Sequence, residues 1–201
     1  MNRLEECVNR HFDFLNQFGY IISKGNNADI ISCKGKNNQI DVIFSSYEYY
    51  LTCEFIGGDN QEFSLDEGLW YGAIEGFRGW YQIANKDDIE KGVIYLAEAV
   101  KSLFERIDVS DPLNFQKIYQ FCVEKRKESL EEYYSEIDLK KAEDYWKSKE
   151  YDKAKKLFEK NIVKLSKSQL KKLEYINKKC VTRRKAWFVS ALRYINRFLL
   201  G

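Results

Sequence analysis

The stretch of residues 38–59 constrains the fold of this chain more than any other part of its sequence. On both sides of Ser45 and Ser46, apolar residues alternate with polar ones. Alternation with a period of two places every second side chain on the same face of a β-strand. The stretch therefore predicts a half-buried antiparallel hairpin, whose inward side chains are Ile40, Val42, Phe44, Tyr49, Leu51, Cys53 and Phe55.

The opposite face of this hairpin is predicted to be acidic and aromatic. Its outward side chains are Asp41, Glu48, Tyr50 and Glu54. Such a face suits solvent or a protein partner, because antiparallel sheets can leave one face open and aromatic residues are enriched at interfaces. We therefore expect a solvated or partner-facing sheet surface here.

The flanking sequence predicts an α+β fold. Apolar residues at helical spacing indicate an N-terminal amphipathic helix from about Arg3 to Phe18, which Gly19 ends. Short strands around residues 20–23 and 28–33 extend the hairpin to an antiparallel β-meander of about four strands.

Helices are expected to cover this sheet. Ser64 and Glu67 form the pattern of a capping box, which marks the start of a helix. A longer helix is predicted from about Asp88 to Ile107, with a cap at residues 85–87, and another begins at Pro112.

Glycine recurs at every fourth position between the capping box and the longer helix. Gly68, Gly72 and Gly76 would form a bare strip if this segment were helical, although each glycine costs about 1 kcal/mol in a helix. Aromatic residues flank them, namely Trp70, Tyr71, Phe77 and Trp80. The segment is either an aromatic binding surface or an irregular cover for the sheet.

Charge divides the chain unevenly, although its net charge is only +2. Residues 1–138 hold 14 Lys and Arg against 25 Asp and Glu, whereas residues 139–201 hold 19 against 6. We therefore predict an α+β domain at 1–110, a helical connector at 111–138 and a basic helical hairpin region with a terminal amphipathic helix at 139–201.

The last residues, 180–201, form a basic amphipathic stretch. Three interpretations stay open: a helix that caps the fold, a helix on a membrane surface, or an arm that binds nucleic acid. Capping is favoured, because the apolar stripe matches what a helical stack must bury at its end.

The sequence lacks the motifs of common catalytic and metal sites. His11 is the only histidine, and the five cysteines are scattered, so neither a zinc site nor a disulfide framework is predicted. Asp29, Asp41 and Glu54 resemble the carboxylates of a metal-dependent nuclease, but Phe55 and Ile56 follow Glu54 without the lysine that such a core needs. We expect a non-enzymatic cytoplasmic protein with no cofactor, no metal, no catalytic residue and no transmembrane segment.

Small residues and aromatics alternate through residues 139–164 in the pattern of a helical hairpin. The positions are Ala142, Tyr145, Tyr151, Ala154 and Phe158. This stretch resembles a single degenerate tetratricopeptide repeat unit, with Lys149, Asn161 and Ser166 where the family usually has glycine, alanine and proline. The resemblance implies a scaffold or adaptor that binds a peptide, with Tyr145 and Tyr151 as its contacts.

The N-terminal half carries a second, weaker pattern. FDFLNQFGYIISK at residues 12–24 is followed by DIIS at 29–32 and QIDVIF at 39–44. Over roughly residues 1–107, the chain resembles small bacterial immunity proteins of toxin systems. That resemblance implies a non-catalytic inhibitor that masks a toxin, and an acidic sheet face would suit a nuclease toxin by imitating phosphates.

Three partners therefore follow from the sequence. On the immunity interpretation a protein partner, the toxin, binds the residues Glu48, Tyr50, Glu54, Trp70 and Trp80. On the scaffold interpretation a peptide binds Tyr145 and Tyr151. On the third interpretation nucleic acid binds the basic C-terminal region.

Overall fold

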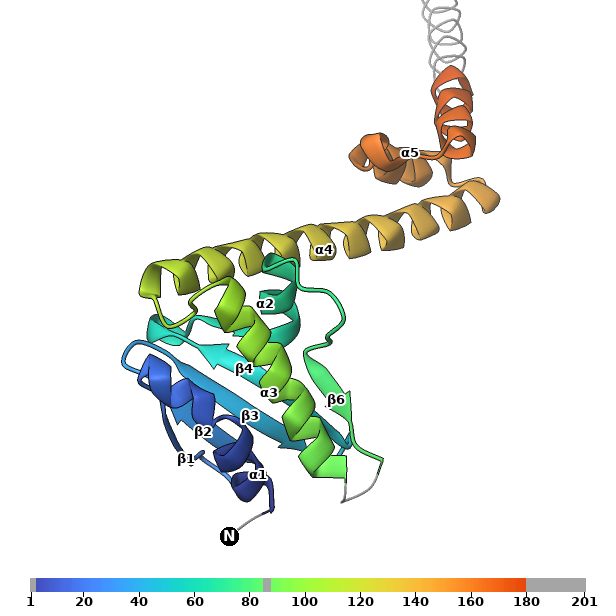
Figure 1. Ribbon diagram of the computed structural model, residues 1–201. Coiled ribbons are helices and arrows are strands. Elements are labelled where there is room, and N and C mark those ends of the chain that lie inside the picture. Colours follow the sequence, from blue (N-terminus) through green and yellow to red (C-terminus); the bar gives the residue numbers. More distant parts are fainter. Residues whose placement is uncertain (1–2, 85–87, 180–201) are drawn as a thin grey trace, which may run out of the picture. The chain divides into compact units, whose positions relative to one another are not determined.

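The computed structural model describes residues 3–84 and 88–179 (Figure 1). These residues fall into two compact units, which divide between Arg126 and Lys127. The division lies inside one helix, α4 (Pro112–Lys147), and inside the stretch 111–138 for which the sequence predicts a connector.

The first unit contains a six-stranded antiparallel sheet. Five strands follow in the order β1-β2-β3-β4-β5, and β6 pairs with the part of β4 that β5 leaves free. Their bounds are β1 Ile21–Lys24, β2 Ile30–Lys34, β3 Gln39–Ser45, β4 Tyr50–Ile56, β5 Glu62–Ser64 and β6 Trp80–Gln82. The predicted α+β class and the antiparallel meander are confirmed, and two strands of three residues extend it.

Strand β4 follows the predicted alternation, since Leu51, Cys53 and Phe55 are fully buried while the residues between them are half-buried or exposed. The prediction for Tyr49 was wrong. This residue lies in the turn before β4 with a left-handed φ of 54°, and its side chain is 59% exposed.

Asp41 also differs from the expected solvated residue, because it is only 9% exposed. It lies on the central strand β3, opposite Ser32 of β2 and Glu54 of β4. Its Oδ1 accepts a hydrogen bond of 2.6 Å from Gln39 Nε2. This bond gives the buried carboxylate a hydrogen-bond partner in place of water.

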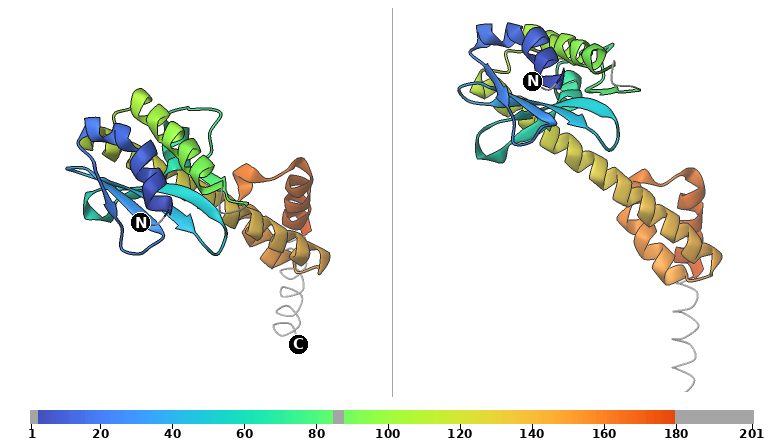
Figure 2. Two further views of the ribbon diagram at one scale, coloured as in Figure 1. Left: turned by 60° about the horizontal axis from the view of Figure 1, so that its bottom comes forward. Right: turned by 90° about the horizontal axis from the view of Figure 1, so that it is seen from below.

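The helices of the first unit cover one face of the sheet (Figures 1 and 2). They are α1 Arg3–His11, the 3-10 helix η1 Asp13–Phe18, α2 Leu65–Tyr71, α3 Asp88–Arg106 and the start of α4. No described helix of this unit covers the other face, which agrees with the partial exposure of Tyr50, Thr52 and Glu54. A short 3-10 helix, η2 (Gly58–Asn60), links β4 to β5.

The predicted N-terminal helix is broken rather than continuous. It ends at His11, and a 3-10 segment carries the chain to Gly19, whose φ of 78° closes it. A 3-10 geometry places residues three apart on one face, which brings both Phe12 and Leu15 into the core at 0% exposure.

The core of this unit lies between the sheet and the helices. Phe63 stacks on Phe55 with ring centroids 4.9 Å apart and meets Phe115 of α4 at 5.0 Å. Gly57 allows this approach, because a Cβ there would lie 2.5 Å from the Phe115 ring.

The glycine-rich segment does not form the helical strip that the sequence left open. Helix α2 ends at Tyr71, and the chain then runs irregularly to β6 through positive φ angles at Ala73 and Gly76. The flanking aromatics therefore separate, because only part of the segment shares one helix.

The second unit is a helical hairpin followed by a third helix. It consists of residues 127–147 of α4, helix α5 (Tyr151–Lys160), the short 3-10 helix η3 (Ile162–Lys164) and a helix described over residues 167–179. Its core holds Ala142, Ala154, Phe158, Leu173 and Ile176.

Each departure from the tetratricopeptide pattern has a local structural counterpart. Lys149 adopts the left-handed φ of 62° that a glycine would adopt more easily, and the N–H of Glu150 closes the turn on Tyr145 O at 2.8 Å. Asn161 is buried and donates to Leu157 O at 3.0 Å. Ser166 caps the next helix, since its hydroxyl accepts from Gln169 N at 3.3 Å.

Two predicted features lie outside the described residues: the cap at residues 85–87 and the basic amphipathic stretch 180–201. Among the helices that are described, none combines the length and the apolar composition needed to cross a bilayer.

Candidate functional site

An open groove of about 510 Å³ lies on the helix-free face of the sheet. Its lining comes from β4, from both short strands that pair with it, and from the turn before it: Glu48, Tyr50, Thr52, Glu54, Ser64, Trp80 and Gln82. Four of the five residues predicted to bind a protein partner therefore line one groove, and Trp70 does not.

Strand pairing brings these residues together from distant parts of the sequence. Alternate residues of β4 point to the same face, and each has a partner in register on a neighbouring strand. The pairs are Tyr50 with Gln82, Thr52 with Trp80, and Glu54 with Ser64.

Gly79 fixes the position of Trp80. Its carbonyl accepts a hydrogen bond of 2.8 Å from Thr52 Oγ1, and its N–H donates to Asp66 Oδ1 at 2.6 Å. A Cβ at this position would lie 2.2 Å from the backbone nitrogen of Asp66, so only glycine fits. The side chains of Thr52 on β4 and Asp66 on α2 thus fix the backbone that leads into Trp80.

Gln82 fixes the turn that carries Glu48. Its Nε2 donates to the carbonyls of Tyr49 at 2.8 Å and of Glu48 at 3.2 Å. The N–H of Ile83 donates to the same Tyr49 carbonyl at 2.7 Å. These bonds hold the turn in its left-handed conformation and set Glu48 at one end of the groove.

The groove is acidic. Neither Glu48 nor Glu54 forms an ion pair with any described residue. Desolvation raises the pKa of Glu54, and the nearby carboxylates of Glu62 and Asp41 raise it further. A partly shielded carboxylate near other acids favours a cationic group in the groove.

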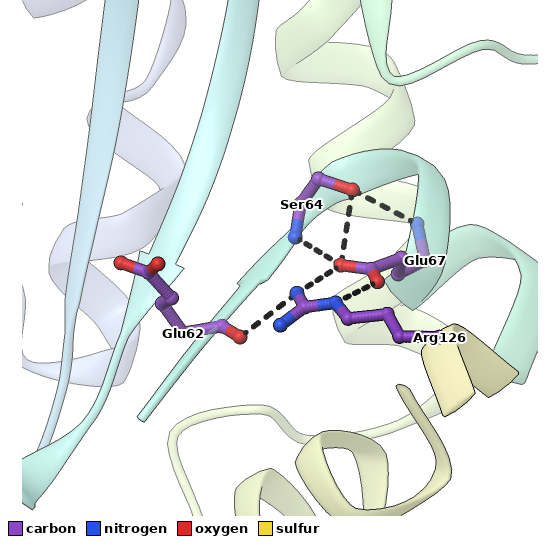
Figure 3. A network of polar contacts seen from close by, with 4 residues as sticks. All are labelled: Glu62, Ser64, Glu67 and Arg126. Carbon is purple, nitrogen blue, oxygen red and sulfur yellow. Dashed lines mark hydrogen bonds and ion pairs between the residues drawn. The ribbon is translucent and has the colours of Figure 1, made fainter. Parts of the chain in front are cut away.

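A second polar network lies beside the groove and anchors Ser64 (Figure 3). Ser64 and Glu67 form the predicted capping box, in which Ser64 N donates to Glu67 Oε2 at 2.9 Å. Arg126 holds both oxygens of Glu67, at 2.6 Å from Nε and 2.7 Å from Nη2, and also donates to the Glu62 carbonyl at 3.1 Å. Although desolvation opposes it, these bonds from Arg126 and Ser64 lower the pKa of Glu67.

Trp70 belongs to the helical layer and not to the groove. Its ring meets Phe121 of α4 edge-on with centroids 5.6 Å apart, and Lys125 Nζ lies 5.5 Å from its centroid. Its side chain remains 58% exposed.

The two tyrosines of the alternative site pack against the core of the second unit. Tyr151 contacts the rings of Trp146 and Tyr175 at 5.3 and 6.0 Å, and Lys179 Nζ lies 4.4 Å above it. Tyr145 packs below Lys153 at 5.2 Å. Both tyrosines therefore help to hold the helical hairpin together.

The described titratable residues include a single histidine, His11. His11 lies in α1, with Nε2 3.6 Å from Glu90 Oε1 of α3. No described group of three or more His, Cys, Asp or Glu is arranged to hold a metal ion. Burial raises the pKa of Cys33 and of Cys122 to about 12, which leaves these thiols protonated and unreactive at neutral pH.

Sequence reasoning missed three lining residues: Thr52, Ser64 and Gln82. Thr52 could have been found, because it lies between Tyr50 and Glu54 on the outward period of β4. Ser64 and Gln82 lie on strands of three residues, which are too short to show alternation.

Comparison with known proteins adds no relative. No family model matches the chain, and the searches of curated proteins and of solved structures return no match. The function must therefore be argued from the chemistry of the groove.

Proposed function

We propose that this chain is a non-catalytic protein-binding protein that engages a basic partner through the groove face of its sheet. The single observation that carries the proposal is the convergence of Glu48, Tyr50, Glu54 and Trp80 on one open groove of a helix-free sheet face. Aromatic side chains supply contact area at an interface, and carboxylates steer and orient a positively charged partner.

The kind of partner follows from the resemblance to small bacterial immunity proteins. On this proposal the partner is a toxin, and the chain inhibits it by covering its active site. A nuclease toxin fits best, because an enzyme that binds phosphates presents the positive surface that an acidic face complements. The four described cysteines, all buried free thiols, support a reducing cytoplasmic setting.

A helical scaffold is the second candidate, and the pocket of the second unit favours it. About 410 Å³ lie between residues 131–138 of α4 and the segment 160–164. Val163, 91% exposed, and Tyr134, 59% exposed, line it and could contact an apolar peptide side chain.

The test is charge reversal on the sheet face. The double variant Glu48→Lys with Glu54→Lys should slow association with the partner and weaken the salt dependence of the association rate. The partner assayed is the product of the neighbouring gene, with rescue of growth on co-expression as a second readout. The matched control is Glu98→Lys with Glu105→Lys, which reverses two exposed carboxylates of α3 on the helical layer.

The two candidates give different results. Loss of binding in the sheet variant alone supports the inhibitor proposal. Unchanged binding in that variant, together with loss in Tyr134→Ala and Val163→Ala, refutes it and favours the scaffold. Tyr145→Ala and Tyr151→Ala do not separate the two, because both tyrosines pack against the core of the second unit.

A further inference from the structure

We infer that the groove is a receptor for one arginine side chain of the partner, which would stack on Trp80 and pair with Glu54. This inference rests on the proposed function, whose binding face it uses, and it specifies the chemistry that the face recognises. Three observations support it: the residues that line the groove, the lack of an ion pair at Glu48 and Glu54, and the contact between Arg78 and Trp80.

The contents of the groove match a guanidinium group. Two aromatic rings, Tyr50 and Trp80, provide apolar faces, and the carboxylates of Glu48 and Glu54 provide acceptors. A guanidinium can stack on an aromatic face and donate two parallel hydrogen bonds to a carboxylate, whereas a lysine ammonium is a compact, strongly hydrated point charge. A groove with both aromatic and acidic walls therefore discriminates in favour of arginine.

The carboxylates of Glu48 and Glu54 form no ion pair with any described residue, although Arg78 lies over the ring of Trp80 in the same groove. In the described part of the chain, Glu54 has no ion-pair partner; the acid Asp41 lies opposite it on β3, and Glu62 lies two residues from its β5 partner Ser64. A cation that enters the groove relieves this repulsion. A phosphate or a nucleic acid would increase it, so the site favours cationic over anionic ligands.

Trp80 already accepts a guanidinium within the chain. The Cζ atom of Arg78 lies 5.6 Å from the centroid of the indole. Cation–π contacts of this kind form within about 6 Å of the ring centroid and are strongest for tryptophan. Hydrogen bonds at Gly79 fix the backbone next to Trp80, which reduces the ordering that the chain must undergo on binding.

The test uses the full-length chain and three peptides of equal length: hexa-arginine, hexa-lysine and hexa-citrulline. Affinities are measured by titration calorimetry, and contact at the groove is followed by the NMR signal of the Trp80 indole N–H, assigned with Trp80→Phe. We expect hexa-arginine to shift this signal and to bind about fivefold more tightly than hexa-lysine, because stacking adds to charge pairing. Hexa-citrulline, which has the shape without the charge, should not bind.

Two variants and one control locate the contact. Glu54→Gln should weaken hexa-arginine binding about five- to tenfold, and Trp80→Ala about threefold with loss of the preference over hexa-lysine. Glu105→Gln removes an exposed carboxylate from α3 and should leave the affinity unchanged. Equal affinity for hexa-arginine and hexa-lysine, or an equal effect of Glu54→Gln and Glu105→Gln, overturns the inference.

The outcomes separate this inference from the proposal on which it rests. If charge reversal abolishes partner binding but hexa-arginine does not shift the Trp80 signal, the sheet face binds its partner without an arginine receptor. If hexa-arginine binds with the stated pattern but partner binding is unaffected by charge reversal, the receptor stands and the inhibitor proposal fails.

Discussion

The ion pair between Arg126 and Glu67 should be a measurable part of the stability of the first unit. It joins α4 to the start of α2 over 59 positions of sequence, and it anchors Ser64 at the wall of the groove. The perturbation is a double-mutant cycle with Arg126→Ala and Glu67→Gln.

The magnitude follows from geometry and exposure. Exposed ion pairs contribute up to about 1 kcal/mol, and hydrogen bonds to charged groups about 1.5–3 kcal/mol. The side chains of Arg126 and Glu67 are 45% and 22% exposed, so solvent screens the pair in part although it is bidentate. We expect Arg126→Ala to cost about 1.5 kcal/mol, with a coupling free energy of about 1 kcal/mol.

That cost corresponds to a change in melting temperature of about 5–6 °C, taking an unfolding entropy of about 2.1 cal/mol/K per residue over residues 1–126. Because the chain has two units, a single global transition is not assumed. The assay is urea unfolding of the full-length chain, followed by hydrogen exchange in peptides from β5 and α2. Lys117→Ala, which removes an exposed cation from the same helix, is the control and should change nothing.

The pH dependence gives the cycle a second test. The folded-state pKa of Glu67 is below its ordinary value of 4.5. A lowered carboxylate pKa contributes stability that is present above the unfolded-state pKa and is lost as the pH falls through the folded-state pKa. The wild type and Glu67→Gln should therefore converge in stability well below pH 4.5. A coupling below about 0.3 kcal/mol at neutral pH, within the error expected for independent sites, would refute the reasoning.

Three further predictions concern single positions. Lys149→Gly should stabilise the second unit by about 0.5–1 kcal/mol in urea unfolding, because glycine adopts the left-handed φ of this turn without strain. A destabilised variant would show that the left-handed φ of Lys149 costs no free energy. Phe158→Ala should lower the free energy of unfolding of the second unit by about 3–5 kcal/mol, and it should raise hydrogen exchange in residues 139–179 while residues 3–84 keep their protection. A loss of protection in both ranges would contradict the division into units. Glu54→Gln should stabilise the chain at neutral pH and lose this advantage as the pH falls below the raised pKa of Glu54, since a raised carboxylate pKa favours the protonated folded state at low pH. Equal stability of the two proteins at pH 7 would show that neither desolvation nor the carboxylates of Glu62 and Asp41 destabilise the charged form of Glu54.

Local patterns in the sequence determined the central elements of this protein. The period of two at residues 39–56 specified both strands of the hairpin and the buried faces of Ile40, Val42 and Leu51. The capping box at Ser64 also specified the start of α2 correctly. These features depend on neighbours within a few residues, so a short window of sequence contains the information that fixes them.

Other features were decided only when distant segments met. A strand of three residues has no readable period, and β6 exists because Tyr50, Leu51 and Thr52 offer backbone partners that β5 does not use. Tyr49 was misplaced because the hydrogen bonds that hold its turn come from Gln82 and Ile83. Trp70 and Trp80, ten positions apart in a segment that could have been one helix, lie on the helical layer and on the sheet face respectively.

The groove best separates what the local sequence determines from what the tertiary structure decides. The sequence determined which residue types face outward from β4, because side-chain direction along a strand alternates locally. It did not determine that Trp80 and Ser64 would join them, since the register between strands is set by packing across the whole sheet. Opposite charges far apart in sequence, such as Glu67 and Arg126, pair only after the core between Phe55, Phe63 and Phe115 has fixed the position of α4.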